Sequence, residues 1–359
     1  MTTCPVNSYN EWDPLEEVIV GQVKGASMPP GHVSVLSAIP EKSALWYKLI
    51  GGHRHPRILI NWAQKELDEF IHILKGEGIT VKQPDIMDFS APFRTPYWKS
   101  RGFCTASPRD SLLVVGDEII ECPMAWRSRY FESHAYRSLL KEYFKNGARW
   151  TSAPKPQLND ALYDYNYRVP QKNMPVQYVI NEYEPVFDAA DFVRCGKDLF
   201  VIRSNVTNQF GIAWLKRHLG EKYTIHEIET TDRQPMHIDC TFMPLCPGKA
   251  LINPERIIID KLPDILRKWD VRVAPTPDPA ESFILRFPAM CSCWTNMNVL
   301  MLDEKRVIVE KSQKSMIKAL KEWDFEPIPC SFMNYSLFGG SFHCATLDIR
   351  RRGELQSYF

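Results

Sequence analysis

The sequence predicts an α/β fold of the propeller type, built from similar β-hairpin and helix units. Two observations support this prediction. An apolar, strand-like run, a short turn with Gly or Asp and a second strand-like run follow one another four times. A helical segment follows each hairpin, and a fifth strand and helix stand near the N-terminus. Because one such unit cannot bury its own apolar face, about five of them favour a closed, radially repeated architecture, with an ordinary α+β sandwich as the alternative.

The expected units follow one another along the chain. The first has a strand at 15–21 and a helix at 61–75. The four hairpins share the apolar–turn–apolar pattern and lie at 111–123, 191–203, 241–253 and 298–310. Their helices place apolar residues at helical spacing and lie at 126–144, 205–219, 261–269 and 312–323.

Composition excludes several classes of protein. The chain has 359 residues, enough for a large core, and its Pro-rich stretches at 154–156 and 275–279 are typical of loops between units. We therefore expect a single domain over residues 1–359. The formal net charge of +1 gives no electrostatic footprint for nucleic acid. No apolar stretch approaches about 18 residues, so neither a transmembrane helix nor a membrane partner is expected.

Cysteine usage indicates a reducing compartment. The ten cysteines form no CxxC pair, and Cys291 and Cys293 are too close for a zinc site. The N-terminus carries neither a secretory signal nor a transit peptide. The prediction is a cytoplasmic protein with reduced thiols and without a structural metal.

Cys344 is the first candidate for chemistry. It follows the pair Gly339-Gly340 and precedes an alternating apolar run. Glycines permit backbone angles that suit a close approach to a ligand, so this cysteine could be presented to a substrate. The competing interpretation is a core cysteine, because free cysteines are usually buried. A nucleophilic thiolate needs a histidine, but the adjacent His343 would point to the opposite face of a strand, which favours a packed or hydrogen-bonded role.

Acidic residues accompany a second histidine. His237 and Asp239 are two residues apart, so on a strand they would face the same cavity, although a local surface pair is the equal alternative. Asp188 could orient a histidine, whereas Asp191 is more typical of a turn or a helix cap. Asp110 either binds a cation or ends a loop.

This set of side chains suits a planar, positively charged substrate. Carboxylates bind a guanidinium group through forked hydrogen bonds, and a thiolate can attack its central carbon. Gly51-Gly52 and Gly339-Gly340 match neither fingerprint of a nucleotide-binding loop.

Longer motifs resemble the glycine amidinotransferase family over nearly the whole chain. They are CPVNSYNEWDPLEEVIVG, PRDSLLVVGDEIIECPMAWRSRYFE, WTSAPKP, FDAADF, PMHIDCTF, NMNVLMLDEKRV and SFHCATLDIRRRG. The resemblance implies the fivefold pseudo-symmetric α/β propeller of the pentein type, in agreement with the repeats. It also implies a transferase that moves the amidino group of L-arginine to an amine and releases L-ornithine, in a ping-pong reaction through an amidino-cysteine.

Site residues carry over from the resemblance by motif. Cys344 would be the nucleophile, His237 the general acid and base, and Asp188 the carboxylate that orients His237. Substrate binding is assigned to five further residues. Asp110 and Asp239 would hold the guanidinium, and Arg256 and Ser292 would contact the amino-acid end of the donor. Met236 is the fifth. The resemblance implies no metal or organic cofactor, and it implies a homodimer.

The acceptor side departs from the glycine-specific animal members. This chain has Cys291-Ser292-Cys293 where they have Ser-Ser-Lys, and Gln234 where they have Asn. The segments VIVEKSQKSMIKALKEWDFEPI and SFHCATLDIRRRGELQSYF resemble cyanobacterial toxin-pathway members, in particular the saxitoxin-pathway amidinotransferase. We therefore expect as acceptor an amino ketone derived from arginine. Glycine, giving guanidinoacetate, and deiminase-like hydrolysis of arginine are the alternatives.

Overall fold

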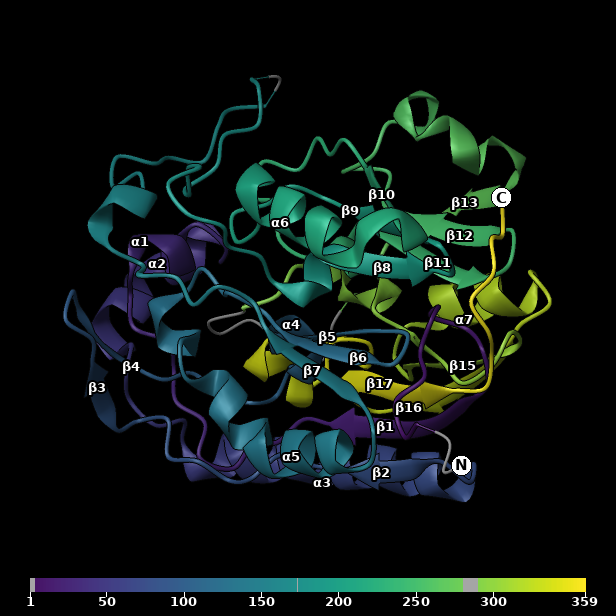
Figure 1. The fold of residues 1–359 in the computed structure, drawn as a ribbon, viewed down its shortest axis with the longest axis horizontal. Coiled ribbons are helices and arrows are strands. Elements are labelled where there is room, and N and C mark those ends of the chain that lie inside the picture. Colours follow the sequence, from purple (N-terminus) through teal and green to yellow (C-terminus); the bar gives the residue numbers. More distant parts are fainter. Residues whose placement is uncertain (1–3, 173, 280–289) are drawn as a thin grey trace.

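In the described part of the chain, five three-stranded sheets form the frame of the molecule (Figure 1). The computed structural model describes residues 4–172, 174–279 and 290–359. In each of these sheets the central strand pairs antiparallel with one neighbour and parallel with the other. The repetition confirms the predicted α/β propeller of the pentein type.

The strands of each sheet come from one stretch of chain, except in the first sheet. There the N-terminal β1 pairs with the C-terminal β17, Val20 opposite Thr346. The five sheets are β17 (Thr346–Arg351), β1 (Leu15–Val20) and β2 (Thr80–Lys82); β5 (Leu112–Val115), β6 (Glu118–Glu121) and β7 (Arg149–Ser152); β8 (Phe192–Cys195), β9 (Asp198–Val201) and β10 (Thr224–Glu227); β11 (Phe242–Cys246), β12 (Lys249–Ile252) and β13 (Asp270–Val273); and β14 (Leu300–Met301), β15 (Arg306–Glu310) and β16 (Glu326–Cys330). A separate hairpin joins β3 (Pro92–Arg94) to β4 (Lys99–Arg101).

The four predicted hairpins are confirmed, but the third strand of each sheet was not predicted. These strands carry sequences such as TVK, RWTS, TIHE and DVRV, with several exposed or half-buried positions. An edge strand of this kind lacks the apolar run that identifies a buried strand.

Helices connect the strands, and α3 and α5 lie along one outer edge of the molecule in Figure 1. The α-helices are α1 (Val33–Leu36), α2 (Glu41–Ile50), α3 (Arg57–Gly76), α4 (Pro108–Ser111), α5 (Arg137–Lys145), α6 (Gln209–Leu219) and α7 (Lys314–Lys321). Two expected helices are wrong in part. The helix expected over 126–144 begins only at Arg137, after two short 3₁₀ turns. The second, expected over 261–269, is replaced by two 3₁₀ turns, Ile259–Lys261 and Asp264–Lys268, because Pro263 disfavours helical backbone at the preceding Leu262, which is extended with a ψ of 147°.

Buried ion pairs join different units of the ring. Arg109 of α4 and Arg194 of β8 each contact Glu11 and Asp348, with N–O distances of 2.7–3.1 Å. We call Glu11, Arg109, Arg194 and Asp348 the ion-paired cluster. No helix in the described part of the chain has both the length and the apolar character needed to span a membrane. The single domain over residues 1–359 stays a prediction.

Candidate active site

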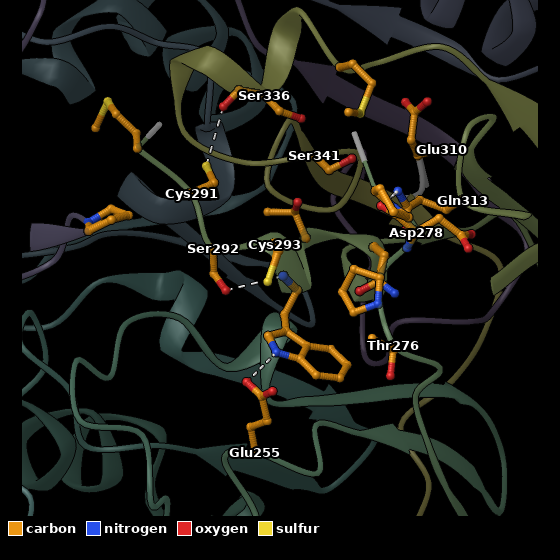
Figure 2. Close-up of a pocket in the computed structure, with 18 of the residues that line it drawn as sticks. Glu255, Thr276, Asp278, Cys291, Ser292, Cys293, Glu310, Gln313, Ser336 and Ser341 are labelled. Carbon is orange, nitrogen blue, oxygen red and sulfur yellow. Dashed lines mark hydrogen bonds between the residues drawn. The ribbon is translucent and has the colours of Figure 1, made fainter. Parts of the chain in front are cut away.

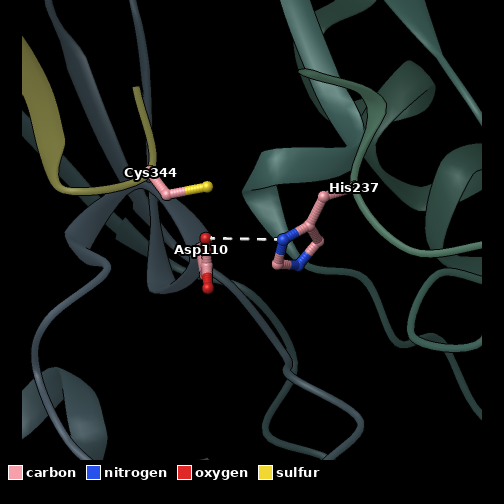
Figure 3. A group of neighbouring side chains, drawn as sticks. All are labelled: Asp110, His237 and Cys344. Atoms are coloured by element: carbon pink, nitrogen blue, oxygen red, sulfur yellow. Dashed lines mark ion pairs between the residues drawn. The ribbon is translucent and has the colours of Figure 1, made fainter. Parts of the chain in front are cut away.

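Cys344 lies in a turn that ends where β17 begins, so it is not on a strand. Its thiol lines a cavity of about 100 Å³, which we call the inner cavity. Gly340 makes room for it, because a Cβ atom at that position would lie 2.8 Å from the sulfur and 2.4 Å from the Cβ of Cys344. Figure 3 shows the sulfur pointing toward the ring of His237, with the carboxylate of Asp110 beside both.

His237 is held from two sides. Its Nε2 lies 3.2 Å from Asp188 Oδ2, and its Nδ1 lies 3.8 Å from Asp110 Oδ1. Its backbone has a φ of 59°, and its backbone N–H donates to Asp191 Oδ1 at 2.9 Å. Asp191 also accepts from Ser204 Oγ at 2.6 Å. Asp191 lies in a turn, as expected, because it ends the 3₁₀ turn Ala189–Asp191; its buried carboxylate also fixes the backbone of His237.

Asp239 stands next to the sulfur. Its Oδ2 accepts from Cys344 Sγ at 3.2 Å and lies 3.0 Å from His343 Nδ1. The segment from Ile238 to Cys240 is a 3₁₀ turn, so the strand expected to carry His237 and Asp239 is wrong. Both side chains nevertheless line the inner cavity. His343 has the hydrogen-bonded role expected from the sequence.

Two carboxylates of this cavity each have one fixed and one free oxygen. Asp110 Oδ2 accepts from Arg129 Nη1 at 2.7 Å. Within the described part of the chain, Asp110 Oδ1 and Asp239 Oδ1 are buried and have no hydrogen-bond partner, and the same holds for Asp188 Oδ1. Buried polar atoms are rarely left unpaired, so these oxygens are ready to accept hydrogen bonds from a bound molecule.

The local charges set the protonation of the side chains in the inner cavity. Burial alone would lower the pKa of His237, but the carboxylates of Asp110 and Asp188 raise it to about 10. Burial, together with Asp239 and Asp110, raises the pKa of the Cys344 thiol well above its usual range. Burial alone would raise the pKa of Asp239, but the hydrogen bond from His343 lowers it. At neutral pH these side chains therefore include an imidazolium and a neutral thiol.

Two residues of the site were not identified from the sequence. Asn298 donates from Nδ2 to Cys344 Sγ at 3.0 Å, and its Oδ1 accepts from the backbone N–H groups of Ser341 and Cys344, both at 3.1 Å. Arg129 is buried and bonds to both Asp110 and Glu132. Both residues lie within the family motifs NMNVLMLDEKRV and PRDSLLVVGDEIIECPMAWRSRYFE, which is the one signal that could have identified them, but their roles depend on partners elsewhere in the chain.

A larger cavity of about 620 Å³, the outer cavity, adjoins the inner one (Figure 2). Arg256 and Ser292 line both cavities and so lie where the two meet, while Met236 lines the inner cavity. Arg256 Nε lies 2.9 Å from Asp232 Oδ2. The structure thus brings seven of the eight predicted site residues to the inner cavity and places the eighth, Asp188, behind His237.

The same side chains include a possible set of metal ligands. One atom each of Asp110, His237 and Cys344 lies within 4.8 Å of the other two. Oxygen, nitrogen and sulfur donors of these types bind transition metals as well as organic cations. The expectation that the protein has no metal therefore needs a direct test.

An α/β propeller that gathers a cysteine, a histidine and several carboxylates in one cavity has the architecture of the guanidine-modifying enzymes. Comparison with known proteins narrows this class, although no family model matches. The chain is 53% identical over 356 residues to the L-arginine:L-lysine amidinotransferase of Pseudomonas savastanoi pv. phaseolicola, covering 99% of this chain and 97% of that protein. It is 48% identical to the mitochondrial glycine amidinotransferase of Gallus gallus, over 99% of this chain and 85% of that one.

Among solved structures, the chain is similar to SxtG, an amidinotransferase from Microseira wollei in the saxitoxin biosynthetic pathway. The two are 56% identical with a TM-score of 0.96, over 99% of this chain and 100% of that chain. The chain belongs to the amidinotransferase family and is a transferase that moves amidino groups.

Proposed function

We propose that this enzyme transfers the amidino group of L-arginine to an amine and releases L-ornithine, by a ping-pong mechanism with a covalent amidino group on Cys344. One observation carries the proposal. The unpartnered oxygens Asp110 Oδ1 and Asp239 Oδ1 belong to the same cavity as the sulfur. A guanidinium is planar and carries N–H donors along its edges, so it matches two buried acceptors beside a nucleophile.

Binding of the donor prepares the sulfur for attack. The positive guanidinium offsets the carboxylates that keep the thiol neutral, so its arrival favours the thiolate. Arg256 and Ser292, where the two cavities meet, hold the amino-acid end of arginine. Bound in this way, the substrate presents its central carbon to Cys344 with the correct orientation, which lowers the entropic part of the barrier.

In the first half-reaction the S–H proton of Cys344 passes to Asp239 Oδ2, 3.2 Å away, and the thiolate attacks the central carbon. The C–N bond to ornithine breaks as the His237 imidazolium, held by Asp188, gives its proton to the leaving nitrogen. In the second half-reaction a neutral amine attacks the amidino carbon and His237 takes the amine proton. The C–S bond then breaks, and the thiolate recovers its proton from Asp239.

Asn298 acts as a positioning residue in this scheme. Its oxygen accepts from two backbone N–H groups, which fixes its amide N–H toward the sulfur. This N–H is a donor to a sulfur that has carboxylates nearby, so it stabilises the thiolate form.

The acceptor we propose is an amino ketone derived from arginine, as in saxitoxin-type toxin biosynthesis. The 56% identity to SxtG and the 53% identity to an arginine:lysine enzyme support a larger amine. Glycine is the second candidate, because a vertebrate glycine amidinotransferase is 48% identical. The predictions of a cytoplasmic protein and a homodimer belong to the same proposal.

Intact-protein mass spectrometry tests the covalent step. Wild-type enzyme mixed with arginine alone should gain the mass of one amidino group and release one equivalent of ornithine. The Cys344→Ala variant should do neither, because it lacks the nucleophile. Cys4→Ala is the matched control, since Cys4 lines neither cavity, and it should behave as wild type.

Three results would contradict the proposal. Ornithine release by Cys344→Ala would exclude this sulfur as the nucleophile. Citrulline accumulating without an amine would indicate hydrolysis by water. Loss of the ornithine burst after treatment with a chelator, with recovery on adding zinc, would identify a metal centre at Asp110, His237 and Cys344.

A further inference from the structure

We infer that Arg129 and Glu132, which we call the forked pair, act together as positioning residues that orient the carboxylates of Asp110 and Asp188 without repelling a cationic substrate. This inference rests on the proposed function, because it concerns the binding and the attack of the guanidinium of arginine. It gives the two residues separate tasks. Arg129 orients the carboxylates, and Glu132 cancels the positive charge of Arg129.

Arg129 is a cation in the wall of a cavity that has to bind a cation. Its side chain lines the inner cavity together with Asp110 and Asp239. The residue is 2% exposed, so solvent screens its charge little. An isolated guanidinium at this place would repel the guanidinium of arginine, so its presence needs a physical reason.

Arg129 orients two carboxylates of the site through one nitrogen atom. Nη1 donates to Asp110 Oδ2 at 2.7 Å and lies 3.8 Å from Asp188 Oδ2. These carboxylates flank His237, whose Nε2 lies 3.2 Å from Asp188 Oδ2 and whose Nδ1 lies 3.8 Å from Asp110 Oδ1 (Figure 3). Because Arg129 occupies Asp110 Oδ2, Asp110 Oδ1 stays available to the substrate in a fixed place beside the sulfur.

Glu132 holds the guanidinium of Arg129 from the other side. Arg129 ends one 3₁₀ turn and Glu132 begins the next. Glu132 Oε2 accepts from Arg129 Nε at 2.7 Å, and Glu132 Oε1 accepts from Arg129 Nη2 at 2.5 Å. Two parallel bonds of this kind set the plane of the guanidinium, and with it the direction of Nη1. Glu132 is 1% exposed and lines neither cavity, so it acts on the site through Arg129.

The charge of Glu132 explains how Arg129 can stand beside a cationic substrate. Burial raises the pKa of the Glu132 carboxyl to about 7, and Arg129 opposes this rise. Both oxygens accept hydrogen bonds from the guanidinium, as an ionised carboxylate does. The forked pair then carries no net charge, which leaves the negative charge of Asp110 effective for binding the substrate.

Two conservative variants separate the two tasks. The ornithine burst, measured without an acceptor over a range of arginine concentrations, gives a half-saturating concentration and a limiting rate. The assay is run at about pH 8, above the pKa of Glu132. Arg129→Lys keeps the charge but not the fork, so the limiting rate should fall about tenfold to 100-fold, with the half-saturating concentration changed less than about threefold. Glu132→Gln leaves the charge of Arg129 uncompensated, so the half-saturating concentration should rise about tenfold, with the limiting rate changed less than about threefold.

A double variant tests the forked pair as a unit and replaces a single variant that does not fold. Arg129→Met combined with Glu132→Met removes both charges of the pair together, a change that buried ion pairs often tolerate. Asp110 loses its fixed partner in this variant, while no uncompensated cation is left in the wall of the cavity. The limiting rate should fall at least as far as in Arg129→Lys, and the half-saturating concentration should change less than about threefold.

The neighbouring ion pair of Arg127 and Asp160 supplies matched controls. Arg127 belongs to the same 3₁₀ turn as Arg129, its Nη2 lies 2.7 Å from Asp160 Oδ1, and neither residue lines either cavity. Arg127→Lys and Asp160→Asn should change neither quantity. Urea denaturation and the amplitude of the burst, which counts active sites, show whether a variant has lost folded enzyme.

Each outcome bears on one proposal. Wild-type half-saturating concentrations and limiting rates in the variants would overturn the inference and leave the proposed function intact. A smaller burst amplitude or a lower stability, with both quantities unchanged in the enzyme that stays active, would give the forked pair a structural role alone and also overturn the inference. The same holds if Arg129→Lys and Glu132→Gln change the same quantity. Absence of the ornithine burst in wild type would overturn the proposed function, and the inference with it.

Discussion

Two buried groups of charged side chains meet at His343, and they differ in how completely their charges are matched. In the ion-paired cluster, Glu11 and Asp348 each have both oxygens in contact with arginine guanidinium groups. In the cavity cluster, which consists of Asp110, Asp188, His237, Asp239 and Cys344, three carboxylates each keep one oxygen that accepts no hydrogen bond from the described part of the chain. The difference teaches that incomplete pairing, rather than buried charge itself, indicates where a ligand binds.

Protonation follows the same division in part, because Asp239 of the cavity cluster also has a lowered pKa: burial alone would raise it, but the hydrogen bond from His343 lowers it. Burial alone would raise the pKa of Glu11 and of Asp348, but their arginine partners lower both. In the cavity cluster, burial raises the pKa of Asp188. His343 joins the groups, with Nδ1 3.0 Å from Asp239 Oδ2 and Nε2 3.2 Å from Glu11 Oε2. Through the ring of His343, the ion-paired cluster positions the carboxylate of Asp239 beside the sulfur of Cys344.

The largest expected effect is on stability, from Arg194→Met in the ion-paired cluster. The variant removes one of the two guanidinium groups that pair with the buried carboxylates of Glu11 and Asp348. The buried negative charge is then only partly compensated, which should lower the free energy of unfolding by about 3–5 kcal/mol. Urea denaturation measures the change. Arg352→Met is the matched control, because the side chain of Arg352 is 74% exposed in its pair with Glu16 and should contribute less than about 1 kcal/mol. Equal losses in the two variants would show that the ion-paired cluster contributes no more to stability than an exposed ion pair.

The next effect is on activity, from Asp110→Asn in the cavity cluster. The asparagine can still accept from Arg129, but it presents an N–H group where the substrate guanidinium needs an acceptor. We expect kcat/KM for arginine to fall about 100-fold to 1000-fold, with the free energy of unfolding changed by less than about 1 kcal/mol. Asp264→Asn, at a side chain that is 81% exposed, is the control and should change neither quantity. A large loss of stability in Asp110→Asn would show that Asp110 has a structural role, like the carboxylates of the ion-paired cluster.

The sequence predicted the parts of the fold and the site that depend on local patterns. The hairpins, such as the one formed by β5 and β6, appear as apolar runs around a glycine or aspartate turn. Family motifs located the cysteine, the histidine and the carboxylates of the cavity. His237 and Asp239 face the same cavity, as predicted. The reason differs from the predicted one, because a turn and not a strand carries them.

Contacts between distant segments could not be predicted in this way. Asn298 and Cys344 are 46 residues apart, and Arg109 and Asp348 are 239 apart. Nothing near either residue in the sequence identifies its partner, because the fold alone brings them together. The unpartnered oxygens are equally invisible, since only the full set of neighbours shows that an oxygen lacks a hydrogen bond.

A last comparison separates the clusters by pH. The pKa of His237 is raised to about 10 in the folded protein, above about 6.5 in the unfolded chain. Its contribution to stability is therefore complete below about pH 6.5 and is lost as the pH rises toward 10. For Glu11 and Asp348 the folded pKa is lowered, so their contribution is present above about pH 4 and is lost as the pH falls.

Variants isolate these two contributions in urea denaturation across the pH range. The stability difference between wild type and His237→Gln should shrink from pH 6.5 to 10, because the folded wild type gives up the proton that its carboxylates hold. The difference between wild type and Arg194→Met should instead shrink below about pH 4, where protonated Glu11 and Asp348 no longer need a cationic partner. A His237→Gln difference that stays constant up to pH 10 would show that the carboxylates of the cavity cluster do not hold His237 in its charged form.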